Sequence, residues 1–176
     1  AERLEAGNKV QKAPKTEGFK QETKLFEQAV SEANRLHPDF VVTCGDIVMD
    51  WDSKDQADEA HRIAMKLEPT IPMYWVSGNH DLGMGGIRPT PETIARYRHV
   101  FGPDYYSFEH KGVSFIVINS TVIHTPDEVP EEWEAQLRFL KRELSVAQRH
   151  GSGHIVVFSH HPFFLNDPNE DVEKER

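Results

Sequence analysis

Short, continuously apolar runs alternate along this chain with segments that carry their apolar residues at helical spacing. The runs cover residues 40–44, 72–76 and 155–158. Runs of this kind are typical of strands buried on both faces of a largely parallel sheet, whose connections are helices. This alternation constrains the fold more than any other feature, and it predicts an α/β domain.

The segments between these runs carry ordinary helix and turn signals. Two apolar runs, 105–108 and 113–119, flank Lys111-Gly112 and predict a β-hairpin, so the sheet should be mixed. No linker-like stretch divides the chain, which favours one domain over residues 1–176. The predicted helices lie at 25–36 before Pro38, at 60–67 with Ser53 as a candidate cap, from Thr90-Pro91 to Gly102, and at 133–147 before Gly151.

Composition excludes several classes of protein. The chain has 176 residues, of which 38% are hydrophobic and 28% charged, so it can bury the core of a globular domain. No apolar run approaches the ~20 residues that cross a membrane. The formal net charge of −9 argues against nucleic acid as a general partner. No signal-peptide pattern follows Ala1, so a cytoplasmic location is expected.

The single cysteine, Cys44, excludes an internal disulfide and any CxxC metal site. Its position at the end of an apolar run favours a buried packing role.

Three of the predicted strands end in side chains that can bind metals. These are Gly45-Asp46, Gly78-Asn79-His80-Asp81 and His160-His161. Taken singly, each has an ordinary explanation, as a turn, a cap or a histidine satisfied in the core. Because ligands bind beyond the carboxyl ends of strands in open α/β sheets, the three clusters are expected to converge. Carboxylate, amide oxygen and imidazole together suit a first-row metal better than calcium.

These three motifs, in this order and ending in His160-His161-Pro162, resemble the calcineurin-like metallophosphoesterases. The branch called calcineurin-like phosphoesterase domain-containing proteins is the most similar. The resemblance covers roughly residues 20–165. It implies a mixed β-sheet sandwich flanked by helices in αββα layers. It also implies a phosphatase or phosphodiesterase with two metal ions (Mn, Fe or Zn) and a bridging hydroxide.

The resemblance assigns roles to five residues of this chain. Asp46 would bridge the two metals, and Asn79 and His160 would bind the second one. His80 would face the substrate and protonate the departing oxygen, and Asp81 would orient His80 and raise its pKa.

Two other positions have alternative roles between which the sequence does not decide. His161 either lines the phosphate pocket or has a packing or surface role. Asn119-Ser120 follows a predicted strand, where a turn is the default and reach into the site is the alternative.

Two further family motifs are not in this sequence. These are an Asp-x-His or Asp-x-Gln on an earlier strand and a Gly-His-x-His on a later one. The chain is therefore expected to be an internal part of the domain that lacks its first and last strands. The alternative to an enzyme is a catalytically incomplete scaffold that binds metal or a protein, with 163–165 as an exposed contact.

The arginines that grip phosphate in the superfamily's protein Ser/Thr phosphatases are also missing. Those proteins carry Gly-Asp-x-x-Asp-Arg-Gly, where this chain has Met49-Asp50-Trp51 in the last three places. They also place Arg before Gly-Asn-His-Glu, where this chain has Ser77. The sequence therefore predicts a different type of phosphoesterase, acting on a small molecule or a phosphoprotein.

Overall fold

The computed structural model describes residues 17–83, 88–165, 167 and 169. None of the helices in this part of the chain is long and apolar enough to span a membrane. Every predicted helix and strand is present, and α4 is a short additional helix. The elements are α1 (Glu17–Leu36), β1 (Val41–Cys44), α2 (Lys54–Ala64), β2 (Met73–Val76), α3 (Pro91–Phe101), β3 (Tyr106–His110), β4 (Val113–Val117), α4 (Ser120–His124), α5 (Pro130–His150) and β5 (His154–Phe158).

The helix ends follow the sequence signals. Ser53 caps α2, where its side chain accepts a hydrogen bond from the backbone N–H of Gln56. Thr90 and Thr93 form a reciprocal capping box at the start of α3. Gly151 ends α5 in the left-handed conformation, with φ of 67°.

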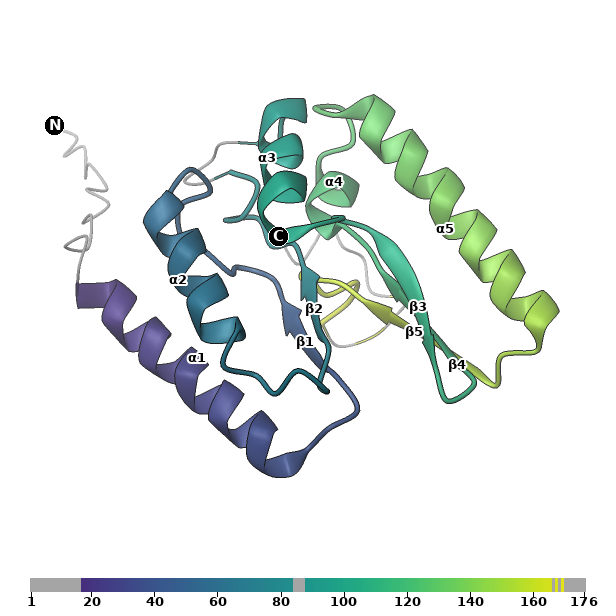
Figure 1. Ribbon diagram of the computed structural model, residues 1–176. Coiled ribbons are helices and arrows are strands. Elements are labelled where there is room, and N and C mark those ends of the chain that lie inside the picture. Colours follow the sequence, from purple (N-terminus) through teal and green to yellow (C-terminus); the bar gives the residue numbers. More distant parts are fainter. Residues whose placement is uncertain (1–16, 84–87, 166, 168, 170–176) are drawn as a thin grey trace, which may run out of the picture.

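The strands form two sheets, as the sandwich implied by the family resemblance requires. In the first sheet β1 and β2 pair in parallel. In the second sheet β4 pairs with β3 in an antiparallel hairpin and with β5 in parallel (Figure 1). The predicted mixed α/β fold is therefore confirmed. Within the described residues β5 is an edge strand, and residues 155–157 are 36–40% exposed.

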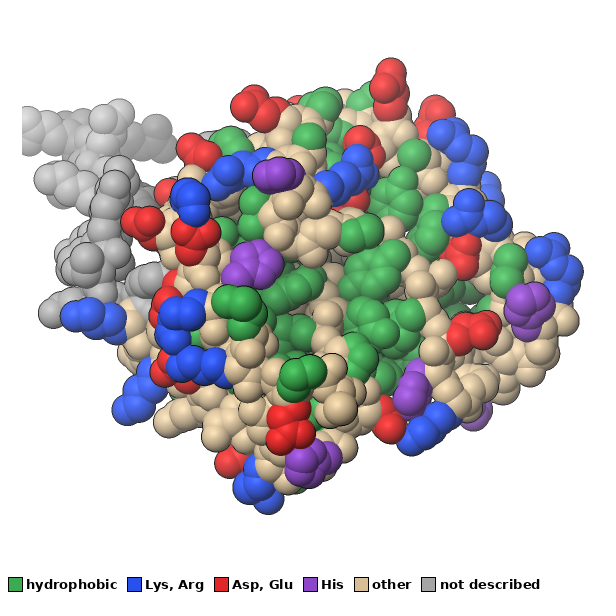
Figure 2. Space-filling model, in the orientation of Figure 1, with side chains coloured by type: hydrophobic (Ala, Val, Ile, Leu, Met, Phe, Trp, Pro, Cys, Tyr) green, Lys and Arg blue, Asp and Glu red, His purple; other side chains and the backbone are tan. Residues whose placement is uncertain are grey.

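The two sheets pack face to face through aromatic rings. The rings of Tyr74 on β2 and Phe108 on β3 stack with centroids 3.8 Å apart. Phe40 packs edge-on against both Phe108 and Phe115. Figure 2 shows hydrophobic side chains gathered in the middle of the face that lies over the sheets, with charged side chains around them.

Helices cover the other sides of the sheets, which gives αββα layers (Figure 1). Val30 of α1 and Ile63 of α2 share a buried cluster that also contacts Val41 of β1. On the second sheet Ile116, next to Phe115 in β4, points the opposite way and packs against Phe139 of α5. The period of two along β4 thus separates the inter-sheet face from the helix face.

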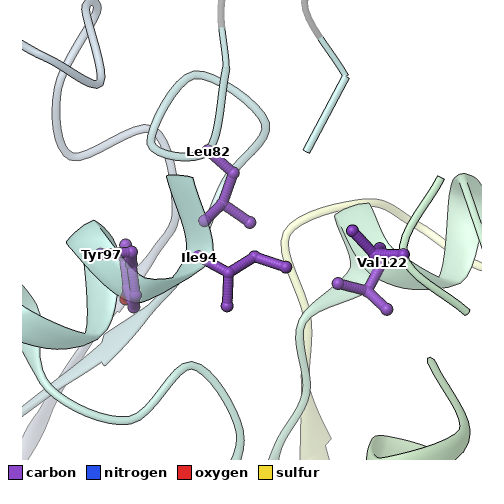
Figure 3. Packing of buried hydrophobic residues seen from close by; sticks show 5 residues of the cluster. Leu82, Ile94, Tyr97 and Val122 are labelled. Carbon is purple, nitrogen blue, oxygen red and sulfur yellow. The ribbon is translucent and has the colours of Figure 1, made fainter. Parts of the chain in front are cut away.

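A third apolar cluster anchors the loop that follows β2. Leu82, which follows Asp81 in this loop, is fully buried against Ile94 and Tyr97 of α3. Val122 of α4 belongs to the same cluster (Figure 3). The packing of Leu82 therefore fixes the segment that carries Asn79, His80 and Asp81 on its C-terminal side.

Candidate metal centre

The ends of β1, β2 and β5 bring three predicted metal ligands together. His160 Nε2 lies 3.1 Å from Asn79 Oδ1 and 3.5 Å from Asp46 Oδ1. The backbone N–H of His80 donates to Asp46 Oδ1 at 3.1 Å, which holds this carboxylate beside the loop after β2. Residues separated by more than a hundred positions thus meet at one edge, as the strand-end clusters predicted.

Glycines make this approach possible. Gly45 has φ of +89°, and Asp46 itself has φ of 51°, so the chain turns sharply as it leaves β1. Gly78 lies directly against this turn. A Cβ atom on Gly78 would lie 2.2 Å from both the backbone nitrogen and Oδ1 of Asp46. The two loops can pack this closely only because residue 78 has no side chain.

A backbone carbonyl sets the tautomer of His160. Nδ1 lies 2.8 Å from the carbonyl oxygen of Cys44, which can only accept a hydrogen bond. Nδ1 of the neutral ring therefore carries the proton, and Nε2 presents its lone pair to Asn79 and Asp46. The thiol of Cys44 is exposed, so its predicted burial was wrong. At this strand end the backbone carbonyl of Cys44 contacts the site, and the side chain is not part of the core.

This donor set fits a cation. Two oxygen atoms lie within 3.5 Å of one imidazole nitrogen, His160 Nε2, and all three atoms are electron-pair donors. In the described part of the chain no group of three or more His, Cys, Asp or Glu residues could hold a metal. The set at the strand ends has only two such residues, Asp46 and His160, and the amide oxygen of Asn79 completes it.

Asp81 is buried beneath this site and binds the backbone. Its Oδ1 accepts from the N–H of Val48 at 2.9 Å, and its Oδ2 accepts from the N–H of Gly78 at 2.7 Å. Burial raises the pKa of Asp81 to about 6, although these hydrogen bonds favour the charged form. The carboxylate thus ties together the loops that follow β1 and β2.

The contacts of His80 differ from the expected ones. Its Nδ1 lies 3.2 Å from the carbonyl oxygen of Met49, so a backbone acceptor orients the ring where the sequence predicted Asp81. The sequence could not predict this contact, because two backbone N–H groups hold the carboxylate of Asp81 beneath the loops. His80 itself is half-buried beside the donor set, where its backbone N–H contacts Asp46.

His161 forms its side-chain hydrogen bond with α4 rather than with Asp46 or Asn79, and its ring centroid lies 4.8 Å from that of His160. Its Nδ1 lies 2.8 Å from the hydroxyl oxygen of Ser120, and its ring centroid is 4.5 Å from that of His124. Burial, together with the neighbouring histidines, lowers its pKa to about 4, so the ring is neutral at pH 7.

Sequence reasoning missed α4, which brings Ser120 to His161. Asn119 caps this helix by accepting from the N–H of Val122 at 3.2 Å. The signal was present, since Asn is a preferred N-cap, but the helix is shorter than a periodicity pattern can reveal.

Comparison with known proteins places the chain among phosphoesterases. Residues 16–175 match the model of the family described as calcineurin-like phosphoesterase. The human protein named serine/threonine-protein phosphatase CPPED1 is 37% identical over 159 residues, which are 87% of this chain and 50% of that protein. The zebrafish (Danio rerio) protein of the same name is 38% identical over 157 residues, 86% of this chain and 50% of its own length. The chain thus spans about half the length of the curated relatives it matches.

Proposed function

Because the chain belongs to the calcineurin-like phosphoesterase family, we propose that the protein is a metal-dependent hydrolase of phosphoesters. The observation that carries this proposal is the convergence of Asp46, Asn79 and His160, whose donor atoms lie within 3.5 Å of His160 Nε2. The family and the named relatives support hydrolysis, and the donor set supports a metal at this edge of the sheets.

Asp46, Asn79 and His160 are the residues of this chain that would hold metal. Asp46 is suited to a dinuclear site because one carboxylate offers two oxygens and a negative charge. Asn79 adds an oxygen without adding charge. Bound Mn, Fe or Zn ions would supply a hydroxide for in-line attack at phosphorus and would neutralise the phosphoryl oxygens.

His80 is the proposed general acid. With Nδ1–H donating to the carbonyl of Met49, the protonated ring carries its second proton on Nε2, and this is the proton that it would give to the departing oxygen, leaving the neutral ring. Asp81 is assigned a supporting role, since it positions the backbone of Gly78 and Val48 around the site.

The name of the relatives favours a phosphoprotein over a small molecule as the substrate. The missing arginines separate this chain from phosphatases that carry the two arginine motifs. They do not exclude protein substrates, because these relatives are named as protein phosphatases. Ser77 and Trp51 occupy positions where that other type has arginine, so the phosphate must be gripped by other groups.

Metal removal tests this proposal. Hydrolysis of p-nitrophenyl phosphate by the full-length protein should fall by at least about 100-fold after chelation, because the metal contributes several kcal/mol of transition-state stabilisation. Adding Mn²⁺ or Zn²⁺ should restore it. An initial rate that is the same before and after chelation would contradict metal-dependent hydrolysis.

The second candidate function is a scaffold that binds metal or a protein without turnover. It is favoured by Phe163, Phe164 and Leu165, which follow the histidine pair and are 49–63% exposed. Turnover of p-nitrophenyl phosphate by the metal-loaded chain rules this alternative out. Metal binding without any turnover by the full-length protein supports it.

A further inference from the structure

Ser120 forms two hydrogen bonds to the residue next to His160. Its Oγ accepts from the backbone N–H of His161 at 3.0 Å and lies 2.8 Å from Nδ1 of the same residue. Ser120 is only 1% exposed, so water does not compete for its hydroxyl. One side chain of α4 therefore holds both the backbone and the ring of His161.

The residue before Ser120 is held in place by a buried network of hydrogen bonds. Asn119, which precedes Ser120, is fully buried, and its side chain donates to Asp104 at 2.8 Å. Gln136 of α5 binds the backbone of Asn119 on both sides, accepting from its N–H at 2.6 Å and donating to its carbonyl at 3.1 Å. A buried polar network thus fixes Ser120 relative to both α5 and the second sheet.

Proton accounting decides the direction of the second hydrogen bond. The Ser120 oxygen accepts from the N–H of His161 and has a second lone pair, but if it also accepted from Nδ1 its buried hydroxyl proton would lack a partner, since the described residues give it no acceptor other than Nδ1. Nδ1 of His161 is then an acceptor, and the ring proton lies on Nε2. His160, one peptide bond away, has the opposite tautomer because its Nδ1 faces a carbonyl.

We propose that Ser120 is a positioning residue of the metal centre, which fixes the segment 159–162 so that His160 Nε2 faces Asp46 and Asn79. Ser120 acts through the backbone of His161 and selects the Nε2–H tautomer of that ring. The effect of Ser120 on metal binding rests on the proposed function, whereas its effect on the tautomers of His160 and His161 does not.

A matched pair of serine variants tests this proposal. Ser120→Ala removes the hydroxyl at the carboxyl end of the β4–β5 pair. Ser114→Ala removes a comparably buried hydroxyl at the other end, where Ser114 Oγ lies 2.7 Å from Ser152 Oγ. The two readouts are the side-chain nitrogen NMR shifts of His160 and His161 in the metal-free chain, and the dissociation constant for Zn²⁺ measured by calorimetry.

In the wild type and in Ser114→Ala, His161 should show the Nε2–H tautomer and His160 the Nδ1–H tautomer. Ser120→Ala should convert both rings to tautomer mixtures and weaken zinc binding about tenfold, the scale expected when support for a ligand is removed. Wild-type tautomers for both rings in Ser120→Ala would overturn the proposal. A wild-type chain that binds no zinc contradicts the proposed function alone, and the NMR result still decides the role of Ser120.

Discussion

Gly78→Ala should abolish zinc binding and phosphoester hydrolysis, with an activity loss of more than about 100-fold. The added Cβ would lie 2.2 Å from the backbone nitrogen of Asp46, and backbone cannot rotate aside as a flexible side chain can. The loops after β1 and β2 must therefore separate, which moves Asp46 away from Asn79. Overpacking of this kind should also lower the free energy of unfolding by about 3 kcal/mol.

Gly153→Ala is the matched control for this variant. A Cβ on Gly153 meets nothing within 4 Å, so its unfolding free energy in urea and its activity should match those of the wild type. If Gly78→Ala keeps wild-type zinc affinity and stability, the close approach of the two loops does not hold the site together.

His80→Gln should slow the hydrolysis of phenyl phosphate by about 10²–10⁴-fold, the usual contribution of a general acid. The loss should be much smaller with p-nitrophenyl phosphate, because p-nitrophenolate departs without needing a proton. Zinc affinity should be unchanged, since His80 is not among the proposed ligands. The two substrates should be compared by steady-state kinetics at saturating metal.

His99→Gln, an exposed histidine in the last turn of α3, is the control and should leave both rates unchanged. An equal loss with the two aryl phosphates would show that His80 does not protonate the leaving group. In that case His80 would act in binding or in stabilising the phosphoryl oxygens.

Much of the fold could be predicted because local signals and packing agree. The strand 41–44 is a short apolar run that ends in Gly45, and α3 begins and ends at its sequence signals. The division into two sheets, which the family resemblance implied as a sandwich, could not be predicted from local patterns alone. It depends on the contact between Tyr74 and Phe108, which no local pattern encodes.

The residues of the candidate site could be predicted because side chains that can bind metals directly follow the predicted strands. Asp46, Asn79 and His160 meet because the carboxyl ends of their strands share one edge. The partners of these side chains were harder to predict, because backbone groups supply them. The carbonyls of Cys44 and Met49 orient His160 and His80, and every residue of any sequence has such a carbonyl.

Calorimetric titration with Zn²⁺ of the wild type, Asp46→Asn and Asp58→Asn tests the metal centre most directly. Asp58 is an exposed carboxylate on α2, paired with Lys54, and its substitution should leave the affinity for zinc unchanged. Asp46→Asn removes the charged ligand and should weaken binding at least about tenfold. Equal zinc affinities in the wild type and Asp46→Asn would contradict a metal centre at the ends of β1, β2 and β5.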